Sequence, residues 1–218
     1  MFPILFRTEF GFIYTFTAVW LVGLFGCILI IWWQDKEFTH WDHLLAGVVG
    51  ALLLGRVQFV LQNGEWFAEN PAERWSIFQG GHGYAGTVLG AAFGLLIITL
   101  AKRTNFRQTI TLLALTVGPL HFVGWLACWF DGCGYGLQAF IGWYAAELPN
   151  NFGLMAVRYR TQVAGILSAA VFTLLLVLVR RRITGRWLSL TAADFWLSLA
   201  CLAAVRGIIY PWQGDIVP

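Results

Sequence analysis

Six long apolar stretches constrain this sequence of 218 residues more than any other feature. Each stretch is close to the roughly 20 residues that an α-helix needs to cross a bilayer core of about 30 Å. The bilayer interior offers no partners for free backbone groups, so such stretches must form helices. The sequence therefore predicts an all-α integral membrane protein, with a single domain over residues 1–218. The six stretches are residues 12–33, 44–62, 84–101, 109–130, 162–180 and 192–210.

The composition excludes a soluble globular domain. Charged residues make up 11% of the chain and the mean hydropathy is +0.70, whereas soluble domains carry about 25% charged residues. The 12 tryptophans are typical of chains whose indole rings lie at membrane–water interfaces. Residues 137–146 are too short to span and are interpreted as an interfacial segment. The net charge of +3 is assigned to membrane topology, and no nucleic-acid partner is expected.

The four cysteines do not suggest a disulfide framework. Cys27 and Cys201 fall inside apolar stretches, where a cysteine behaves as a small apolar residue. Cys128 and Cys133 are separated by five positions and match neither a CxxC pair nor a His/Cys ligand pattern. We therefore expect neither disulfides nor a metal site.

The basic residues predict how the chain is oriented. Loop 102–108 carries three Lys or Arg residues and loop 180–186 carries four arginines, whereas loop 63–82 carries three glutamates and one arginine. With six spans, the two basic loops fall on one side, and the positive-inside rule makes that side cytoplasmic. The sequence thus predicts a multi-pass membrane protein with both termini on the outer face.

Glycine-rich and polar segments collect at the outward helix ends under this topology. They cover residues 79–86, 124–136 and 206–215. Arg56 instead lies inside the second stretch, where an arginine costs about 2.5–3.5 kcal/mol and requires a partner or a cavity. Arginine forks match phosphate oxygens. We therefore predict a phospholipid phosphate site formed by Arg56, Arg206, Gly80, Gly81 and Gly86.

Each candidate side chain also has a structural interpretation. Arg56 can pair with a carboxylate such as Asp131 or extend to the interface, and Arg206 lies where such extension is easier. His82 can cap a helix start. His121 can bond to a neighbouring helix, or it can hold a haem or a pigment.

The order of the motifs resembles that of the prolipoprotein diacylglyceryl transferase family. Gly55-Arg56-Val57, Asn70-Pro71 and the glycines from Gly80 to Gly90 are similar to the family's stretch GR…NP…GG-x-x-x-HGG-x-x-G. Residues 124–136 look like its signature GR-x-G-x-F-x-x-G-x-x-x-G. Thr161-Gln162 is similar to the Ser-Gln of HPSQLYE, and residues 206–215 resemble RF-x-x-E-x-x-RGD. The resemblance covers about residues 12–215 and implies the family's helical bundle.

The resemblance also implies that most of the family's polar groups are replaced here. Members move the diacylglyceryl group of phosphatidylglycerol onto a prolipoprotein cysteine thiol. Only Arg56 and Arg206 remain among the matched charged positions, and the chain stops before the family's seventh helix. The family's histidine falls at Ala85; the signature's arginine, asparagine and glutamate fall at Trp125, Cys128 and Cys133; the histidine and glutamate of HPSQLYE fall at Tyr159 and Gly165; the last motif's glutamate and arginine fall at Tyr210 and Gln213.

These replacements favour a homologue without catalysis. It would bind phospholipid, with no other cofactor, or pack as an accessory subunit against membrane-embedded protein partners. The alternative is an active transferase in which His82 and His121 act in place of the lost groups. They precede Ala85 and Trp125 by three and four residues, so each pair shares a helix face. A minor alternative is a haem- or pigment-binding subunit that uses either histidine.

Overall fold

The computed structural model describes residues 4–8, 11–34, 41–77, 81–149, 154–185 and 190–214. Within these residues, six helices are long and apolar enough to cross a membrane, which confirms the predicted six-span bundle. They are α1 (Thr15–Gln34), α2 (Trp41–Gln62), α4 (Tyr84–Lys102), α5 (Phe106–Asp131), α6 (Thr161–Thr184) and α7 (Ala192–Ile209). The short elements are α3 (Gly64–Glu69), η1 (Pro71–Trp75), η3 (Tyr210–Trp212), and two antiparallel hairpins, β1 (Ile4–Thr8) with β2 (Gly11–Tyr14) and β3 (Ala145–Pro149) with β4 (Met155–Tyr159).

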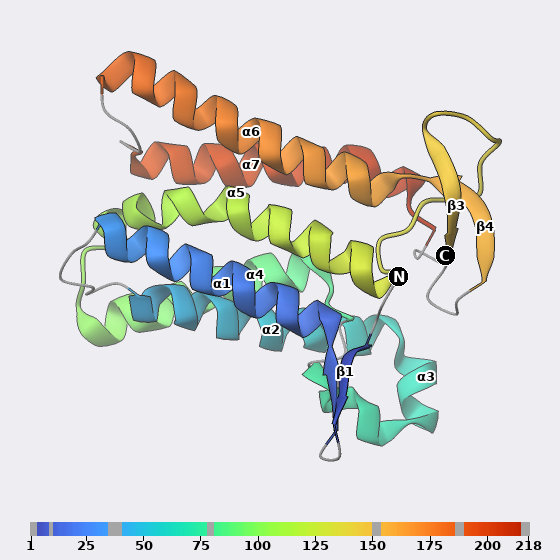
Figure 1. Ribbon diagram of the computed structural model, residues 1–218. Helices are drawn as coiled ribbons and strands as arrows, with labels where there is room; N and C mark the ends of the chain where they lie inside the picture. Colours follow the sequence, from blue (N-terminus) through green and yellow to red (C-terminus); the bar gives the residue numbers. More distant parts are fainter. Residues whose placement is uncertain are drawn as a thin grey trace. The chain divides into compact units, whose positions relative to one another are not determined.

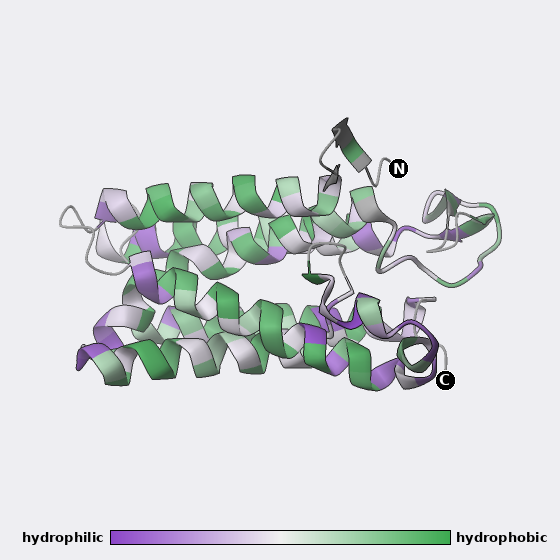
Figure 2. Cartoon of the chain, turned by 90° about the horizontal axis from the view of Figure 1, so that it is seen from below, coloured by the Kyte–Doolittle hydropathy of each residue, from purple (hydrophilic) through white to green (hydrophobic). Residues whose placement is uncertain are grey.

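The spans differ from the predicted ones mainly at their ends. The first helix begins at Thr15 rather than residue 12, because residues 11–14 pair with β1 as strand β2. The basic side chains belong more to helices than to loops, since Lys102 ends α4 and Arg180 lies in the last turns of α6. Apolar residues cover most of the helical surface, and polar residues gather toward the helix ends (Figure 2). This distribution is typical of helices surrounded by lipid.

The chain divides into two compact units, residues 28–113 and residues 1–27 with 114–218. Helices α1 and α5 each contribute to both units. We call the first the glycine unit, after the packing of α2 against α4. We call the second the aromatic unit, after the ring contacts of Tyr159 with Tyr144 and Trp212 at one of its ends. The predicted site residues fall in both units, so each is described separately.

In the glycine unit, α2 and α4 pack backbone against backbone (Figure 1). Glycines recur at every fourth position of α4 and face α2. A side chain at Gly90 would overlap the carbonyl oxygen of Gly50, and one at Gly94 would overlap the carbonyl oxygen of Ala46. Such spacing of small residues permits close helix contact in membranes. The separation of the two helices is thus set by the absence of side chains.

One end of this pair carries a buried histidine. His43 is fully buried, with Nδ1 2.7 Å from a carboxylate oxygen of Asp42 and Nε2 3.0 Å from Oγ1 of Thr104. Lys102, at the end of α4, bonds to the same carboxylate. The polar groups at this end therefore satisfy one another.

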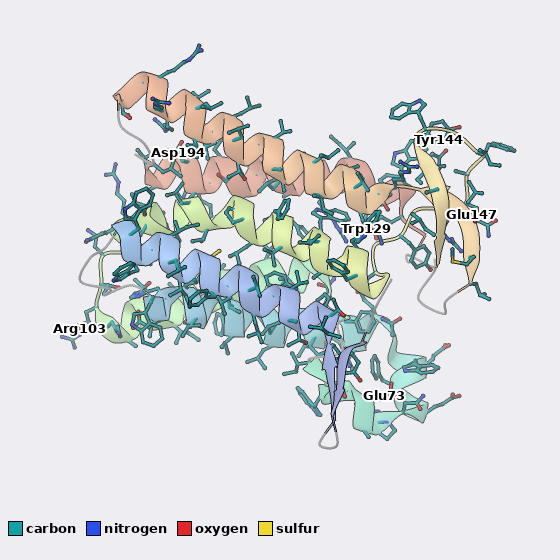
Figure 3. The ribbon with its side chains drawn as sticks, in the orientation of Figure 1. Glu73, Arg103, Trp129, Tyr144, Glu147 and Asp194 are labelled. Atoms are coloured by element: carbon teal, nitrogen blue, oxygen red, sulfur yellow. A yellow bond between two sulfur atoms is a disulfide. The ribbon has the colours of Figure 1, made fainter. Side chains whose placement is uncertain are left out.

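In the aromatic unit, α6 and α7 lie side by side and antiparallel (Figure 1). Arg180 donates to the Asp194 carboxylate at 2.8 Å, and Asp194 also accepts from the backbone N–H and the hydroxyl of Thr191 in a capping box. Asp194 marks this end of the helix pair, whereas Tyr144 and Glu147 mark the other (Figure 3). The end of α6 and the start of α7 are thus joined by an ion pair.

A small sheet closes the opposite end of the aromatic unit. Residues 135–139 run between β4 and residues 212–214. Leu137 donates to the carbonyl of Trp212 at 2.8 Å and accepts from the N–H of Tyr159 at 3.1 Å. This arrangement was not predicted, because it joins residues 135–139 both to β4 and to residues 212–214, which lie more than 70 residues further along the chain. It ties the chain after α5 and the chain after α7 to the start of α6.

Candidate functional site

Trp125 is the centre of the closed end of the aromatic unit. Its indole, on α5, is 7% exposed and packs against Gly165 of α6, where any side chain would overlap the ring. The guanidinium of Arg206, on α7, lies 4.4 Å from the ring centroid. This distance is in the range of a cation–π contact. Three helices therefore meet at one indole.

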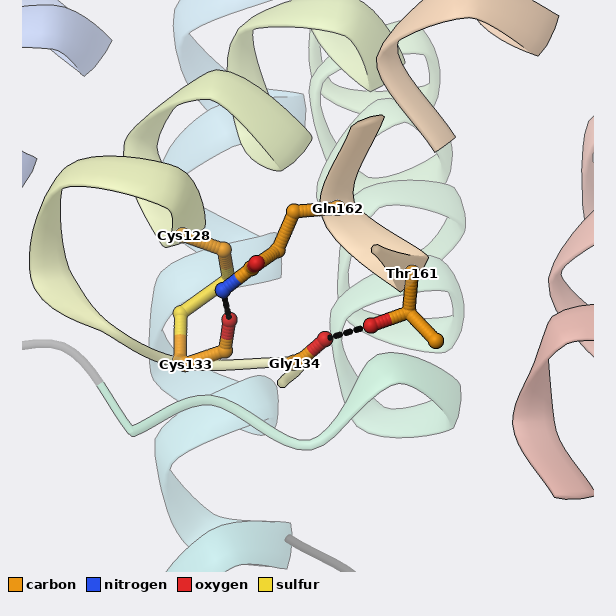
Figure 4. Close-up of a disulfide and its surroundings, with 5 residues drawn as sticks. All are labelled: Cys128, Cys133, Gly134, Thr161 and Gln162. Carbon is orange, nitrogen blue, oxygen red and sulfur yellow. Dashed lines mark hydrogen bonds between the residues drawn. A yellow bond between two sulfur atoms is a disulfide. The ribbon is translucent and has the colours of Figure 1, made fainter. Parts of the chain in front are cut away.

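Cys128 and Cys133 form a disulfide (Figure 4), which corrects the expectation that the cysteines are unpaired. After α5 ends, the backbone turns through Gly132 and Gly134, which have φ angles of 91° and 65°. Glycine adopts these angles without steric cost. The turn brings the two cysteine Cα atoms to 4.6 Å. The spacing of five residues did not reveal this turn.

The first residues of α6 hold the disulfide loop in place. Thr161 Oγ1 donates to the carbonyl of Gly134 at 2.7 Å, and Gln162 Nε2 donates to the carbonyl of Cys133 at 2.8 Å (Figure 4). Both side chains are buried. The segment that resembles the family's Ser-Gln pair therefore contacts the segment that resembles its glycine signature.

Two buried polar side chains of this end were not among the predicted site residues. Arg158, on β4, is 7% exposed and lies 4.8 Å from the ring centroid of Tyr135. Gln213, after η3, is 3% exposed, and its Nε2 is 3.3 Å from the position that a Cβ atom would take at Gly134. In the sequence, Arg158 could have been noticed only because it lies three residues before Thr161, which begins the segment that resembles the family's Ser-Gln pair.

In the glycine unit, Arg56 is 4% exposed and binds backbone groups of the chain between α2 and α4. Its guanidinium donates to the backbone carbonyls of Arg74 at 3.0 Å, Gly81 at 3.2 Å and Glu73. Two phenylalanine rings lie within 5.5 Å of it. Backbone carbonyls thus compensate part of the cost of burying this charge. The predicted role of Arg56 in phosphate binding stays a prediction.

The predicted glycines of this unit lie around the start of α4. Gly81 has a φ of 70°, and Gly86 donates its N–H to the Oε1 of Gln58. Gly80 lies outside the described residues. Each described glycine has a structural reason to be glycine, since a side chain at Gly81 would meet the Phe59 ring and one at Gly86 would meet α2.

His82 does not cap α4, because Gly83 occupies the N-cap position. Burial, followed by the nearby charge of Arg56, lowers the pKa of His82 to about 4. The imidazole is therefore neutral at pH 7. A neutral imidazole can accept a proton, which is the property that the alternative function requires.

His121 belongs to the aromatic unit and lies on α5 one turn before Trp125. Its Nδ1 is 3.1 Å from the carbonyl of Val117 in the same helix. Among the described residues, no group of three or more His, Cys, Asp or Glu side chains gathers in a way that could hold a metal ion. The haem or pigment role of either histidine stays a prediction.

The predicted site residues thus form two sets. Arg56, Gly81, His82 and Gly86 belong to the glycine unit, and His121 and Arg206 belong to the aromatic unit. Within each unit the residues lie close in space, as the contacts of Arg56 with Gly81 and of Arg206 with Trp125 show. The structure adds the disulfide, Arg158 and Gln213 to the second set.

Comparison with known proteins gives one consistent result. The family model described as prolipoprotein diacylglyceryl transferase matches residues 3–217. A phosphatidylglycerol–prolipoprotein diacylglyceryl transferase of Cereibacter sphaeroides is 29% identical over 180 residues, which are 77% of this chain and 60% of that protein. The protein of the same name from another strain is 26% identical over 215 residues, covering 86% of this chain and 73% of its own length.

A third relative with this printed name, from Idiomarina loihiensis, is 27% identical over 112 residues. The alignment covers 51% of this chain and 41% of that protein. The chain therefore spans less than two thirds of the length of two of these three relatives.

Proposed function

Since the chain belongs to the prolipoprotein diacylglyceryl transferase family, we propose that it is a member without transferase activity that binds phospholipid in the membrane. The family fold is retained over nearly the whole chain. What differs is the chemistry at the positions that resemble the family's motifs. The proposal therefore rests on the contacts of those positions.

The packing of Trp125 is the observation that carries this proposal. Arginine is expected here from the family signature, and a glutamate is expected at Gly165. The indole instead lies against Gly165 and beneath Arg206. An indole cannot neutralise phosphate charge, and a glycine cannot transfer a proton. The two replacements also fit each other sterically, since only glycine leaves room for the ring.

The disulfide supports the same proposal. Cys128 and Cys133 take the positions of a family asparagine and glutamate, and both sulfur atoms are consumed by the bond between them. A disulfide sulfur neither donates a proton nor stabilises a departing phosphate. Three signature positions thus hold groups that are unsuited to the transfer.

Loss of activity is tested by complementation of a bacterial strain that lacks its transferase, together with transfer to a lipobox peptide in vitro. We expect neither growth nor acylation. The control is the full-length transferase of Cereibacter sphaeroides expressed at the same level. Robust acylation of the peptide thiol by this chain would overturn the proposal.

Arg206, Arg56 and the glycines Gly81 and Gly86, with Gly80, are the proposed lipid-contacting residues. Arg206 combines a cation with an apolar ring near the end of a span, an arrangement that suits a phosphate above acyl chains. The accessory role is proposed alongside. Purification in mild detergent should yield bound phospholipid and a stoichiometric membrane protein partner. A lipid-free, partner-free monomer would contradict both roles.

The second candidate is an active transferase. The observation that favours it is the place of the half-buried His82, three residues before Ala85 and near enough to Arg56 for that charge to act on the imidazole. In that case His82 is the candidate general base of the glycine unit, and His121 is the candidate of the aromatic unit. The His82→Ala variant separates the candidates, because it would abolish any acylation that His82 supports. A full loss in that variant, after activity in the natural sequence, would establish the enzyme.

The proposed location is the bacterial plasma membrane, with both termini outside. Disulfides persist in oxidising compartments, so the Cys128–Cys133 bond agrees with an outward position for the end of α5. Reporter fusions after residues 105 and 140 test this orientation. We expect a cytoplasmic signal from the first fusion and a periplasmic signal from the second, and the reverse pattern would contradict the proposal.

A further inference from the structure

The polar cluster at the start of α2 contains a hydrogen-bonded chain of three side chains. Nδ1 of His43 lies 2.7 Å from Oδ1 of Asp42, and Nε2 lies 3.0 Å from Oγ1 of Thr104. All three residues belong to the glycine unit. Arg103 marks this end of the unit and Glu73 marks the other (Figure 3). A carboxylate, an imidazole and a hydroxyl in this order are the groups that activate an oxygen nucleophile.

The carboxylate decides which nitrogen of the imidazole carries the proton. An ionised carboxylate only accepts hydrogen bonds, so in the neutral ring Nδ1 of His43 donates to Asp42. Nε2 is then the basic nitrogen, and the Thr104 hydroxyl donates to it. The second carboxylate oxygen of Asp42 bonds to Lys102, which holds the carboxylate in place. Asp42 therefore orients the ring so that its basic nitrogen faces a hydroxyl.

The burial of the three side chains matches these roles. His43 is fully buried and the Asp42 side chain is 19% exposed, so the packing around them keeps the ring in one orientation. Both lie in the first turn of α2, whereas Thr104 lies in the turn between α4 and α5 and is half-buried. A second molecule therefore reaches the hydrogen-bonded chain at Thr104.

The start of α5 supplies donors beside this hydroxyl. The helix has 26 residues and begins at Phe106, two residues after Thr104. The first amides of a helix carry the positive end of its dipole. The Asn105 side chain accepts from the N–H of Arg107 at 3.0 Å, and the amides of Asn105 and Phe106 have no backbone acceptor among the described residues. These amides suit an oxygen that develops negative charge.

Thr99 adds an unpaired hydroxyl at the same place. Its carbonyl accepts the N–H of Thr104 at 3.1 Å, and the residue is 5% exposed. Its Oγ1 has no hydrogen-bond partner within the described part of the chain, whereas buried hydroxyls are nearly always paired. A purely structural link between α2 and α4 leaves this atom unused, but a bound substrate or a water molecule gives it a partner.

The charges around Thr104 favour an anionic substrate. Lys102, Arg103 and Arg107 are exposed and lie within three residues of it. Basic side chains at a site raise the local concentration of anions. The apolar surface of the helices ends here (Figure 2), so the apolar part of a substrate can stay in the lipid while its charge contacts the basic residues. The matching substrate is a carboxylic ester of an anionic amphiphile.

We propose that Thr104, His43 and Asp42 form an esterase site that hydrolyses carboxylic esters of anionic amphiphiles. Thr104 Oγ1 attacks the carbonyl carbon and its proton passes to Nε2 of His43, while the first amides of α5 bind the oxyanion. The C–O bond of the ester then breaks, and His43 returns the proton to the departing alcohol. Water attacks the acyl group on Thr104 in the same way and releases the acid.

Thr104 and His43 are the catalytic residues of this site, and Asp42 is a positioning residue. None of the residues that the transferase resemblance selects takes part. Ester hydrolysis is measured apart from acylation of a lipobox peptide, so this proposal and the proposed function can fail separately.

The test uses the full chain purified in detergent. The probes are 4-nitrophenyl octanoate, mono-4-nitrophenyl suberate and a fluorophosphonate, which attaches covalently to activated hydroxyl groups. We expect turnover of both esters, with the anionic suberate faster at low salt, and fluorophosphonate attachment at Thr104 by mass spectrometry. Absence of turnover, or attachment only at other residues, would overturn the site. Equal rates for the two esters would overturn the anionic substrate.

Variants of the nucleophile locate the activity. Thr104→Val keeps the volume of the side chain and removes the hydroxyl, so it should lower kcat by about a hundredfold or more and abolish fluorophosphonate attachment. Thr104→Ser should retain both. The matched control is Thr111→Val on α5, because that hydroxyl donates to the carbonyl of Arg107 in its own helix; it should behave as the natural protein. Unchanged kcat in Thr104→Val would overturn the proposal.

Two further variants separate catalysis from a structural link. His43→Gln removes the base and should lower kcat as Thr104→Val does. Asp42→Asn keeps an acceptor for Nδ1 but removes the charge that stabilises the imidazolium, so kcat should fall while KM is unchanged. Lowered unfolding midpoints with unchanged kcat per folded molecule would show a structural link alone and overturn the proposal. Thr104→Val decides the matter if His43→Gln does not fold.

Discussion

Two buried arginines, one in each unit, have opposite surroundings. In the glycine unit, Arg56 donates to three backbone carbonyls of a loop that closes over it. In the aromatic unit, Arg158 makes one hydrogen bond of 3.5 Å, and its Nε has no partner in the described chain. The first arrangement ties the guanidinium to the segment that follows α2, whereas the second leaves Nε of the guanidinium without a hydrogen bond among the described residues. The two buried charges therefore differ in how far the chain itself compensates the cost of burial.

The contacts between helices also differ between the two units. In the glycine unit, α2 and α4 meet through backbone atoms that cannot move aside. In the aromatic unit, α5 and α6 meet through the Trp125 side chain, which has rotatable bonds. We therefore expect substitutions in the first contact to cost more than similar ones in the second.

The largest effect is expected for Gly90→Ala in α4. The added methyl group would overlap the carbonyl oxygen of Gly50, so the helices must separate, at a cost of about 3 kcal/mol or more. Thermal or denaturant unfolding in detergent measures this cost. Gly207→Ala in α7 is the control, because nothing lies within 4 Å of that position, and it should be neutral or stabilise by up to about 1 kcal/mol. Equal effects of the two variants would remove the distinction between the units.

Gly165→Ala should cost about 1–3 kcal/mol, because its methyl group meets the Trp125 ring. Adding Trp125→Leu removes the ring and should recover most of that loss. A double-mutant cycle on the unfolding free energies measures the coupling. Strictly additive losses would show that the glycine and the indole are not a matched pair.

Opening the Cys128–Cys133 bond should cost about 2 kcal/mol, the loop-closure entropy of a short disulfide loop. Reductant should lower the unfolding midpoint of the natural protein but not that of the double variant Cys128→Ser/Cys133→Ser. Alkylation under denaturing, non-reducing conditions should label Cys27 and Cys201 alone. Labelling of all four cysteines would contradict the bond.

The smallest effect on the free energy of unfolding is expected from a change of pH, through the titration of His82. Because the pKa of His82 is lowered from 6.5 to about 4, the unfolded chain binds a proton between these values and the folded chain does not. Stability from this histidine is therefore present above pH 6.5 and is lost as the pH falls toward 4. His82→Gln should flatten this part of the profile of unfolding free energy against pH. An unchanged slope would mean that the surroundings of His82 do not lower its pKa.

The helical framework was predictable because it follows from local hydropathy. A run of apolar residues has to span the bilayer whatever its neighbours are, and the predicted ends of α2, α4 and α6 lie within a few residues of the observed ones. The hairpins were not predictable in this way. Strand β4 is recognised only through its pairing with β3 and with residues 135–139.

The site was predictable in part. Arg206 was selected as a site residue from its place in a degenerate motif. In the structure its guanidinium lies 4.4 Å from the centroid of the Trp125 ring. The disulfide depended on two positive φ angles that no spacing rule contains. Burial of Gln213 depended on segments far apart in the chain, since residues 135–139 and the Trp212 carbonyl meet only in the folded state.

The hydrogen bonds of Arg56 to backbone carbonyls bear on how α2 is inserted into the membrane. Its three carbonyl acceptors lie 17 to 25 residues further along the chain, so the ribosome makes them only after α2 has been synthesised. Until then the nascent helix carries an unneutralised guanidinium that disfavours full entry into the lipid. Synthesis of the acceptors removes that barrier. We therefore expect α2 to enter the lipid fully only after residues 73–81 have been synthesised.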